Sequence, residues 1–260
     1  MGQASGERAG VRGRGEAGTR RAAALGSRGR TGPVAISVIV PVLDERNELE
    51  ATLARARGPL VAELIVVDGG SRDGSAEQAA TFADRVLRSP AGRARQMNAG
   101  AGQARGDVLL FLHADTHLPP GWDSAVARAI ESGAVGGRFD VRIRGRHPFL
   151  PVIARLMNLR SRLTRISTGD QAIFVRSRVF RSLGGFPDLP LMEDVAFSVA
   201  LRRVGRVACL RDRVATSGRR WERDGVARTV ALMWALRLAY AAGVPAALLA
   251  RWYGAGGRGE

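Results

Sequence analysis

The chain has 260 residues, of which 45% are hydrophobic, and a formal net charge of +16 at pH 7. This length and composition suit a globular protein with one sizeable core. The single cysteine, Cys209, excludes an internal disulfide and a multi-cysteine metal site. All 40 basic residues are arginine. Such a bias in amino-acid usage weakens the inference that the positive charge serves to bind a polyanion. We therefore expect no nucleic-acid partner.

Residues 1–33 contain seven arginines and two glutamates and almost no large apolar side chains. Such a composition cannot bury a core, so we predict a disordered Arg/Gly-rich tail. The segment lacks the apolar run of a secretory signal. An overextended start site would also explain it.

The pattern changes at residue 35 to AISVIVPVL, an apolar and β-branched run that predicts a buried strand closed by Pro41. Apolar side chains at i, i+4 and i+7 then predict a surface helix over residues 48–57. The same unit recurs further on, with a strand ending on Asp68, a helix over 75–83, a strand over 85–88 and a helix over 92–104. Repetition of strand, loop and helix predicts a parallel sheet.

Polar side chains follow three of the predicted strands. Asp44 and Glu45 follow the first strand, Asp68 ends the second, and the strand VLLFLHADT ends in His113 and Asp115. Ligands of open α/β sheets bind beyond the carboxyl ends of the strands, so these residues predict a site for a metal-bound phosphate or a sugar-like ligand. His113 and Asp115 could hold a divalent cation together. A capped turn, with Asp115 bonded to nearby amides, is the alternative.

The glycine-rich loop after Asp68 has neither the G-x-G-x-x-G pattern nor the Walker lysine pattern. A dinucleotide-dependent dehydrogenase and a P-loop ATPase are therefore not favoured.

The ordered segments SVIVPVLDE, ELIVVDGGSRDGS, GRARQMNAG and LLFLHADT together resemble the nucleotide-sugar half of family 2 glycosyltransferases. The resemblance implies the GT-A fold, an α/β fold with a mostly parallel central sheet flanked by helices, followed here by C-terminal helices. It covers about residues 35–218, with a nucleotide-sugar half over about 35–118 and an acceptor half over about 119–218.

The resemblance also implies roles for individual donor-side residues. Pro41, Asp44 and Glu45 match the segment that lines the base pocket, although asparagine is usual at position 44. Asp68 matches the aspartate that recognises the uracil and ribose region.

Asn98 matches the helix that leads to the metal motif, and Arg93 or Arg95 could contact phosphate, although both could equally be solvated helix surface. Asp115 matches the last aspartate of the DXD-type motif, which binds a Mn2+ or Mg2+ ion bridging the diphosphate. His113 stands where an aspartate is more typical, and histidine can also ligate manganese.

In the acceptor half, we predict a helix over residues 122–130 and a strand over 135–143. Residues 149–165 form an amphipathic pattern that could lie on an anionic membrane. It could equally cover its own core while its arginines point outward. The segment STGDQAIFVR predicts a strand, whose acceptor-side residues would be Gly169, Asp170 and Gln171.

Glu193 and Asp194 stand at the start of a predicted helix, where the helix dipole alone would favour them. In the family pattern, GGF followed by Glu-Asp marks the acceptor site, and Asp194 matches the catalytic base. An inverting transfer needs such a carboxylate, because it must accept the proton of the attacking hydroxyl.

Beyond two short predicted strands, over 207–210 and 214–216, lie Arg219, Arg220 and Trp221. This segment could close over the donor diphosphate or the acceptor, or it could be a packed tryptophan between exposed arginines. Residues 219–253 predict a helical segment broken at 243–245, and its charge-free run is too short to span a bilayer.

The sequence therefore predicts a metal-assisted, inverting glycosyltransferase that uses a nucleotide-sugar donor, with a UDP-sugar expected, and an unidentified acceptor hydroxyl, for which a lipid is one candidate. We expect a cytoplasmic location with peripheral membrane contact as an option. Two alternatives remain open: a sugar-phosphate nucleotidyltransferase-like enzyme, and a non-catalytic protein tethered to membrane or RNA.

Overall fold

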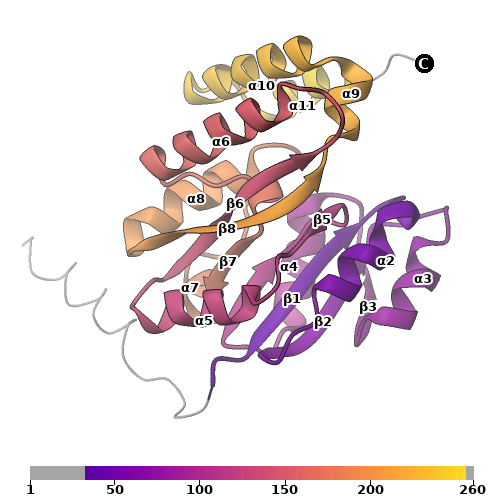
Figure 1. Ribbon diagram of the computed structural model, residues 1–260, viewed down its shortest axis with the longest axis vertical. Helices are drawn as coiled ribbons and strands as arrows, with labels where there is room; N and C mark the ends of the chain where they lie inside the picture. The colour runs from indigo at the N-terminus through magenta and orange to yellow at the C-terminus, as the bar shows by residue number, and fades with distance from the viewer. Residues whose placement is uncertain (1–32, 256–260) are drawn as a thin grey trace, which may run out of the picture.

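A computed structural model describes residues 33–255, so the predicted tail lies outside the described part except for Pro33. These residues fold around one 8-stranded sheet with the order β3-β2-β1-β4-β7-β6-β8-β5 (Figure 1). The strands are β1 (Ile36–Val42), β2 (Val61–Asp68), β3 (Arg85–Arg88), β4 (Val108–Phe111), β5 (Thr116–His117), β6 (Gly136–Arg144), β7 (Ile173–Arg176) and β8 (Val207–Ser217). The helices are α2 (Arg46–Arg55), α3 (Ser75–Phe82), α4 (Arg93–Gln103), α5 (Trp122–Glu131), α6 (Leu150–Thr164), the 3-10 helix η1 (Gly169–Gln171), α7 (Ser177–Ser182), α8 (Glu193–Val204), α9 (Arg219–Asp224), α10 (Val226–Ala241) and α11 (Ala246–Ala255).

The first four strands form the parallel half of the sheet. β1 lies between β2 and β4, and β3 pairs with the outer side of β2, all in parallel register. The parallel arrangement that repeated strand, loop and helix predicted is therefore confirmed. Each crossover carries a helix, as parallel neighbours require.

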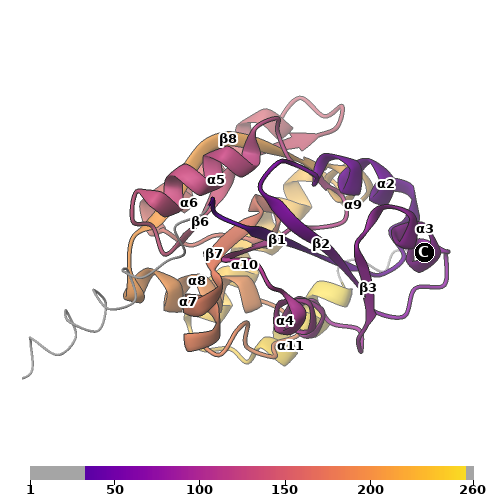
Figure 2. The ribbon, with the colours of Figure 1, turned by 90° about the horizontal axis from the view of Figure 1, so that it is seen from below.

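Both faces of this half are buried, because alternate residues of each strand face opposite layers. Val38 and Val40 belong to one apolar cluster, which also contains Leu49 of α2. Ile39 belongs to a second cluster, with Met97 of α4. Figure 2 shows α4 on the opposite side of β1 and β2 from α2.

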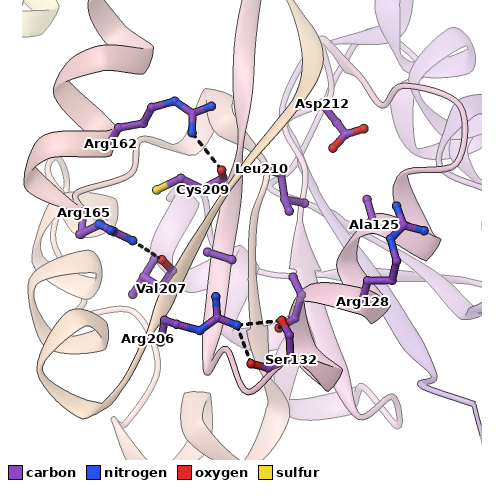
Figure 3. A pocket seen from close by; sticks show the side chains of 12 residues that line it. Ala125, Arg128, Ser132, Arg162, Arg165, Arg206, Val207, Cys209, Leu210 and Asp212 are labelled. Atoms are coloured by element: carbon purple, nitrogen blue, oxygen red, sulfur yellow. Dashed lines mark hydrogen bonds between the residues drawn. The ribbon is translucent and has the colours of Figure 1, made fainter.

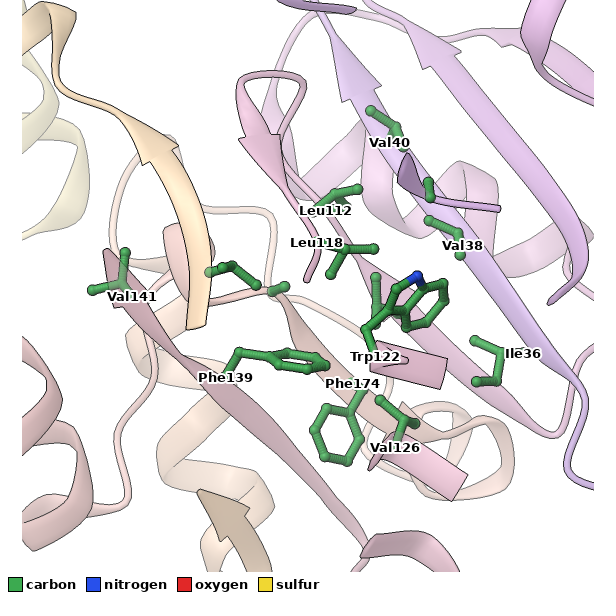
Figure 4. Packing of buried hydrophobic residues seen from close by; sticks show 14 of the residues in the cluster. Ile36, Val38, Val40, Leu112, Leu118, Trp122, Val126, Phe139, Val141 and Phe174 are labelled. Atoms are coloured by element: carbon green, nitrogen blue, oxygen red, sulfur yellow. The ribbon is translucent and has the colours of Figure 1, made fainter. Parts of the chain in front are cut away.

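The second half of the sheet is mixed. β7 is antiparallel to both β4 and β6, β8 is parallel to β6, and β5 is antiparallel to β8. Figure 4 shows the core over this junction, where Trp122 of α5 packs between the strands. Phe139 and Phe174 meet there edge to face, with ring centroids 6.0 Å apart.

The predicted fourth strand over residues 108–116 is too long. β4 ends at Phe111, and the chain then turns, since the Thr116 N–H donates to the carbonyl of His113 at 3.1 Å. Residues 116–117 pair instead with β8 as the separate strand β5. Pro41 does not close the first strand either, because β1 continues to Val42.

Two further predictions are corrected by local geometry. Gly169–Gln171 form η1 rather than strand, because Thr168 and Gln171 build a reciprocal capping box around that turn. The two short strands expected over 207–216 are one strand, β8. Its pairing with β6 shifts between Arg138 and Asp140, and this irregularity absorbs the extra residues of β8.

The C-terminal helices α10 and α11 pack on the loop that precedes α8. Met192 of that loop forms a small cluster with Leu236 and Leu249, which are almost fully buried. The outer faces of the two helices leave large apolar side chains exposed, among them Trp234 and Trp252. Across residues 33–255, no helix combines the length and apolarity needed to cross a bilayer.

The packing of α4 on the sheet depends on Gly100. A Cβ at this position would lie 2.6 Å from Cγ2 of Ile39 and 3.0 Å from Cγ2 of Val67. Only a residue without a side chain allows the helix to approach β1 and β2 this closely.

We predict that Gly100→Ala lowers the free energy of unfolding by about 1–3 kcal/mol through overpacking. Gly102→Ala is the matched control, because a Cβ there meets nothing within 4 Å in the same helix. That control should gain roughly 0.5–1 kcal/mol from helix propensity. Urea unfolding of both variants makes the comparison, and a similar change at the two positions would contradict close packing at Gly100.

Candidate active site

The structure gathers the predicted strand-end residues along one edge of the sheet. Asp68 pairs in register with Val42, so the loops after β1 and β2 begin side by side. The Leu112 N–H donates to the carbonyl of Ile39 at 3.0 Å, which brings the HADT turn to the same edge. Asp44, Asp68 and Asp115 therefore surround one region of the surface, as parallel strands require.

The donor-side loops are tied to each other by their own carboxylates. Asp68 is 2% exposed and accepts the backbone N–H groups of Gly70 at 3.0 Å and Ser71 at 3.1 Å. Asp44 accepts the backbone N–H of Arg72 at 2.8 Å. These two aspartates hold the loops in shape, and any contact with a nucleotide would use their remaining lone pairs.

Arg219 of α9 bridges the carboxylates beside the HADT turn. Its Nη2 lies 2.7 Å from Oε2 of Glu45 and 4.0 Å from Oδ2 of Asp115. The carbonyl of Asp115 also accepts Nη2 of Arg144 at 3.1 Å. Positive charge thus lies next to the acidic edge where a diphosphate is predicted to bind.

The carboxylate pair Glu193–Asp194 begins α8 and lines a small cavity together with His113 of the HADT turn. Asp194 accepts the backbone N–H of Gly169 at 2.8 Å and that of Val195 at 2.7 Å. Burial nevertheless raises the pKa of Asp194 above its ordinary value, against the opposing effects of these bonds and of Arg93 and Arg160.

Glu193 is 5% exposed and differs from Asp194 in its surroundings. Burial, together with the charge of Asp194, raises the pKa of Glu193 to about 7, although Arg93 acts in the opposite direction. A cavity of ≈ 10 Å³, about the size of one water molecule, lies between this pair, His113 and Gly169.

Asp170 is a third carboxylate at this centre. Burial first, and then the charges of Asp194 and Asp115, raises the pKa of Asp170, while Thr168 and Arg160 lower it. Its Oδ1 is buried and has no hydrogen-bond partner among the described residues. Gln171 holds the turn by accepting the Thr168 N–H at 3.2 Å.

His113 packs directly against Gly169, where a Cβ would overlap its Nε2. Burial and the charge of Arg93 lower the pKa of His113 to about 3, so its imidazole is neutral at physiological pH. A neutral imidazole can ligate a metal, and that role of His113 stays a prediction.

The residues of this edge fit a divalent cation that is held by one protein carboxylate and takes its other ligands from substrate and water. Within residues 33–255, no three His, Cys, Asp or Glu side chains converge as a metal site. Mg2+-type ions often take one or two protein carboxylates and fill their other positions with substrate phosphates and water. Asp115, whose side chain is 26% exposed, fits that arrangement. Asp170 lies near enough for the charge of Asp115 to raise its pKa.

Several predicted residues make contacts that the sequence did not indicate. Asn98 donates to the carbonyl of Phe186 at 2.8 Å and accepts its N–H at 2.9 Å, so its amide holds the GGF loop. Arg95 pairs with Asp188 on the surface at 2.9 Å, whereas the charge of Arg93 lowers the pKa values of Glu193 and Asp194. Donor contacts of Asn98 and Arg95 therefore remain predictions that would require these bonds to change.

The α9 residues are also already engaged. The guanidinium of Arg220 lies 3.8 Å from the ring centroid of Tyr253, and its Nε is 3.6 Å from Asp224. Trp221 is half-buried against the main apolar cluster. Their acceptor-side roles remain predictions.

Arg160 is the residue of this centre that sequence reasoning missed. The amphipathic pattern suggested that the arginines of this helix point outward, but Arg160 is half-buried and acts electrostatically on Asp170 and Asp194. Its Nε and Nη2 are buried and have no partner among residues 33–255. The signal was its spacing, because it follows the inward-facing Ile153 by seven residues and Met157 by three.

Unusual backbone conformations flank the site. Asp44, Ala172 and Met192 adopt φ values of 53, 47 and 69, a left-handed conformation that is uncommon for residues other than glycine. Asp44 directly precedes Glu45, Met192 directly precedes Glu193, and Ala172 directly follows Gln171. Such conformations concentrate where side chains must be aimed at a ligand.

Solved structures of glycosyltransferases share this architecture. Staphylococcus aureus TarS residues 1–349 in complex with UDP-GlcNAc match with a TM-score of 0.53 and 18% identity over 70% of this chain and 58% of that one. Glucosyl-3-phosphoglycerate synthase from Mycobacterium tuberculosis, in complex with Mn2+, UDP and glucosyl-3-phosphoglycerate, matches with a TM-score of 0.52 and 21% identity over 70% and 72%. The fold is thus the GT-A type of glycosyltransferases, and the predicted fold class is confirmed.

The sequence comparison is more specific. The family model described as Glycosyl transferase family 2 matches residues 37–196, and the chain belongs to that family. Undecaprenyl-phosphate 4-deoxy-4-formamido-L-arabinose transferase of Pseudomonas fluorescens SBW25 is 29% identical over 159 residues, covering 55% of this chain and 46% of the relative. The transferase of that name from Pseudomonas aeruginosa LESB58 is 32% identical over 114 residues, covering 39% and 33%. The alignments thus span less than half the length of these relatives.

The raised pKa of Glu193 predicts a pH-dependent stability. Between its ordinary value of 4.5 and about 7, the native state keeps a proton that the unfolded state has released, so stability falls as pH rises through this window. Glu193→Gln, which mimics the protonated form, should therefore stabilise the protein by roughly 2 kcal/mol more at pH 8 than at pH 5.

Urea unfolding at the two pH values measures this difference. Glu50→Gln, an exposed position on α2, serves as the control and should show no such dependence on pH. If Glu193→Gln shifts stability equally at pH 5 and pH 8, the native pKa of Glu193 is not raised.

Proposed function

We propose that this family 2 member transfers a sugar from a nucleotide-diphosphate donor, with a UDP-sugar as the expected donor, to an acceptor oxygen with inversion. The observation that carries the proposal is the position of Asp194. Its carboxylate is fixed by two backbone N–H groups, is half-buried, and lines the same small cavity as His113 of the HADT turn. Support for the donor comes from the TarS structure, which contains UDP-GlcNAc.

Asp194 acts as the general base in this proposal. An acceptor hydroxyl that attacks the anomeric carbon must lose its proton, and a carboxylate with a raised pKa is a better acceptor for that proton. The N–H groups of Gly169 and Val195 fix the orientation of the carboxylate. Inversion in one step requires no covalent intermediate, so no nucleophilic serine or cysteine is needed.

The donor side must stabilise the departing diphosphate. Asp115, with His113 as a candidate second ligand, would hold a Mn2+ or Mg2+ ion, which when bound neutralises phosphate charge. Arg219 and Arg93 supply further positive charge from the chain itself, one beside Asp115 and one beside the carboxylate pair.

The acceptor in this proposal is a lipid or isoprenoid-type molecule. The relatives named above are transferases whose names specify undecaprenyl phosphate. An acceptor phosphate is already ionised and needs no general base, and the unpaired guanidinium atoms of Arg160 would suit such an anion. A lipid hydroxyl would instead depend on Asp194.

The outer face of α6 carries exposed apolar side chains that could contact the membrane in which a lipid acceptor resides. Five large apolar side chains recur there at alternating spacings of three and four residues, and each is 46% exposed or more, namely Phe149, Val152, Leu156, Leu159 and Leu163. We call these residues the α6 stripe. Arg155 is an exposed basic residue of the same helix. An apolar stripe with basic neighbours favours peripheral contact with an anionic membrane, which we place on the cytoplasmic side.

The alternatives receive less support. A nucleotidyltransferase should carry a glycine-rich loop with basic residues after the first strand, but PVLDERNE stands there. A non-catalytic tethering protein would have no need of two carboxylates with raised pKa values at the start of α8.

The first experiment separates donor binding from turnover. We expect one nucleotide sugar from a panel of UDP-, GDP- and dTDP-sugars to bind with manganese, as measured by calorimetry. Asp115→Asn should weaken that binding by about tenfold or more, because the metal ion at the diphosphate would lose its charged protein ligand. Asp194→Asn should retain donor binding but lose turnover by about 10²–10⁴-fold with a hydroxyl acceptor.

Glu50→Gln is the control for both measurements. Failure of every nucleotide sugar to bind, with or without metal, would overturn the proposed function. Full turnover by Asp194→Asn with a lipid phosphate would remove the general base and favour the phosphate acceptor.

The membrane contact is tested by partitioning onto vesicles that contain phosphatidylglycerol. Replacing Leu156 and Leu163, which are 60% and 75% exposed, with serine should reduce partitioning by about tenfold, because two apolar side chains are removed from the interface. Leu43→Ser, an exposed leucine away from α6, should have little effect. Equal partitioning of all three proteins would exclude the α6 stripe as the contact.

A further inference from the structure

A second hollow lies away from the candidate active site. It has a volume of ≈ 610 Å³ and lies between α5, α6 and the first half of β8 (Figure 3). Four arginines from three parts of the fold line it: Arg128 of α5, Arg162 and Arg165 from α6 and its C-cap, and Arg206 before β8. Asp212 is the single acidic residue among the lining residues, so the hollow carries a net charge of +3.

Three of these guanidinium groups are held in position by the protein. Arg162 donates to the carbonyl of Cys209 at 3.1 Å and Arg165 to that of Val207 at 2.8 Å. Arg206 donates to the carbonyl and Oγ of Ser132 at 2.7 and 2.8 Å. A guanidinium has five N–H donors, so each group retains donors for a ligand. Fixed side chains also lose little conformational entropy when a ligand binds.

Hydrogen bonding to backbone carbonyls of β8 accounts for the positions of Arg162 and Arg165, but it does not explain why all four arginines gather here. Arg162 alone among the four pairs with a carboxylate, that of Asp140 at 2.6 Å. For Arg128, Arg165 and Arg206, no ion pair occurs within residues 33–255. Figure 3 shows Arg128 on the side of the hollow opposite Arg162 and Arg165. Three arginines without an ion pair outnumber the one lining carboxylate, Asp212, and their mutual repulsion would be relieved by a bound anion.

We propose that this hollow is a binding site for a phosphate-bearing anion, distinct from the donor site. Planar guanidinium groups bind phosphate oxygens with two parallel hydrogen bonds, and the volume lies within the range of small-molecule sites. Arg206 lies beyond the C-terminal end of α8, whereas Glu193 and Asp194 begin that helix. A helix of 12 residues is about 18 Å long, so one phosphate group does not contact both Arg206 and the carboxylate pair.

The chain provides its own reporter for this site. Cys209, the one cysteine in the sequence, lines the hollow and is partly exposed. Its alkylation by iodoacetamide, an uncharged reagent, therefore reports occupancy of this hollow and not of the donor site. The experiment uses the full chain with an excess of UDP and no added manganese, because UDP competes with pyrophosphate at the donor site whereas pyrophosphate would chelate the metal.

We expect inorganic pyrophosphate to slow the alkylation of Cys209 saturably, by about fivefold or more, relative to sodium chloride at the same ionic strength. Arg128→Ala and Arg206→Ala should raise the half-saturating concentration by about tenfold each, because each removes a charged hydrogen-bonding group. Arg95→Ala, at an exposed arginine outside the hollow, and Asp194→Asn should leave protection unchanged.

Vesicles of phosphatidylglycerol, compared with vesicles of phosphatidylcholine, form the second arm. Protection by pyrophosphate identifies a soluble phosphate ligand, and protection by the anionic vesicles alone identifies a lipid headgroup with the same chemistry. The proposal is overturned if neither protects Cys209, or if protection survives unchanged in both Arg128→Ala and Arg206→Ala. Loss of protection in Asp194→Asn would also overturn it, since the effect would then arise from the active site.

Discussion

Burial of both faces of β1, β2 and β4 is the constraint on which the rest of this structure depends. Every residue of β1 from Ile36 to Val42 is buried, and so is every residue of β4. No charged side chain can be placed within these strands without a large desolvation cost. Apolar burial therefore excludes polar groups from the middle of these strands. Ser37 and Glu63, near the amino ends, are hydrogen-bonded to each other at 2.7 Å, and the other polar groups stand at the carboxyl ends, which parallel pairing gathers at one edge. The donor side follows directly from this exclusion.

The surroundings of Glu193 and Asp194 are built differently, because β7 is antiparallel to β4. The capped turn η1 just before β7 presents a backbone N–H to Asp194, while α8 begins at the same point with Glu193 and Asp194. Charge repulsion among these carboxylates is partly offset by Arg93 and Arg160, which come from helices on other parts of the sheet. The site thus balances burial, which raises carboxylate pKa values, against fixed hydrogen bonds and arginines, which lower them.

Local pattern predicted much of the fold, since the period of apolar residues specified the parallel strands and most helices. It failed where a tertiary contact decides the conformation. Residues 169–171 turn because of a capping box, and β8 continues through charged residues because β6 accommodates an irregular register. The residues of the candidate site also divide into those that local motifs indicate and those whose position depends on tertiary contacts. Asp115 and Asp194 were recognisable from ordered motifs, whereas the inward position of Arg160 depends on how α6 packs, and the engagement of Asn98 depends on a loop 88 residues away.

That bond between Asn98 and Phe186 has a consequence for how the molecule moves. The side-chain amide of Asn98 both donates to and accepts from the backbone of Phe186, so two hydrogen bonds join α4 to the GGF loop. A residue at 185 other than glycine would need to displace the amide, since a Cβ there would lie 2.7 Å from its Oδ1. Local opening of the GGF loop therefore requires both side-chain hydrogen bonds of Asn98 to break. The amide hydrogen of Phe186 would accordingly exchange with solvent more slowly than that of a loop residue without such a partner.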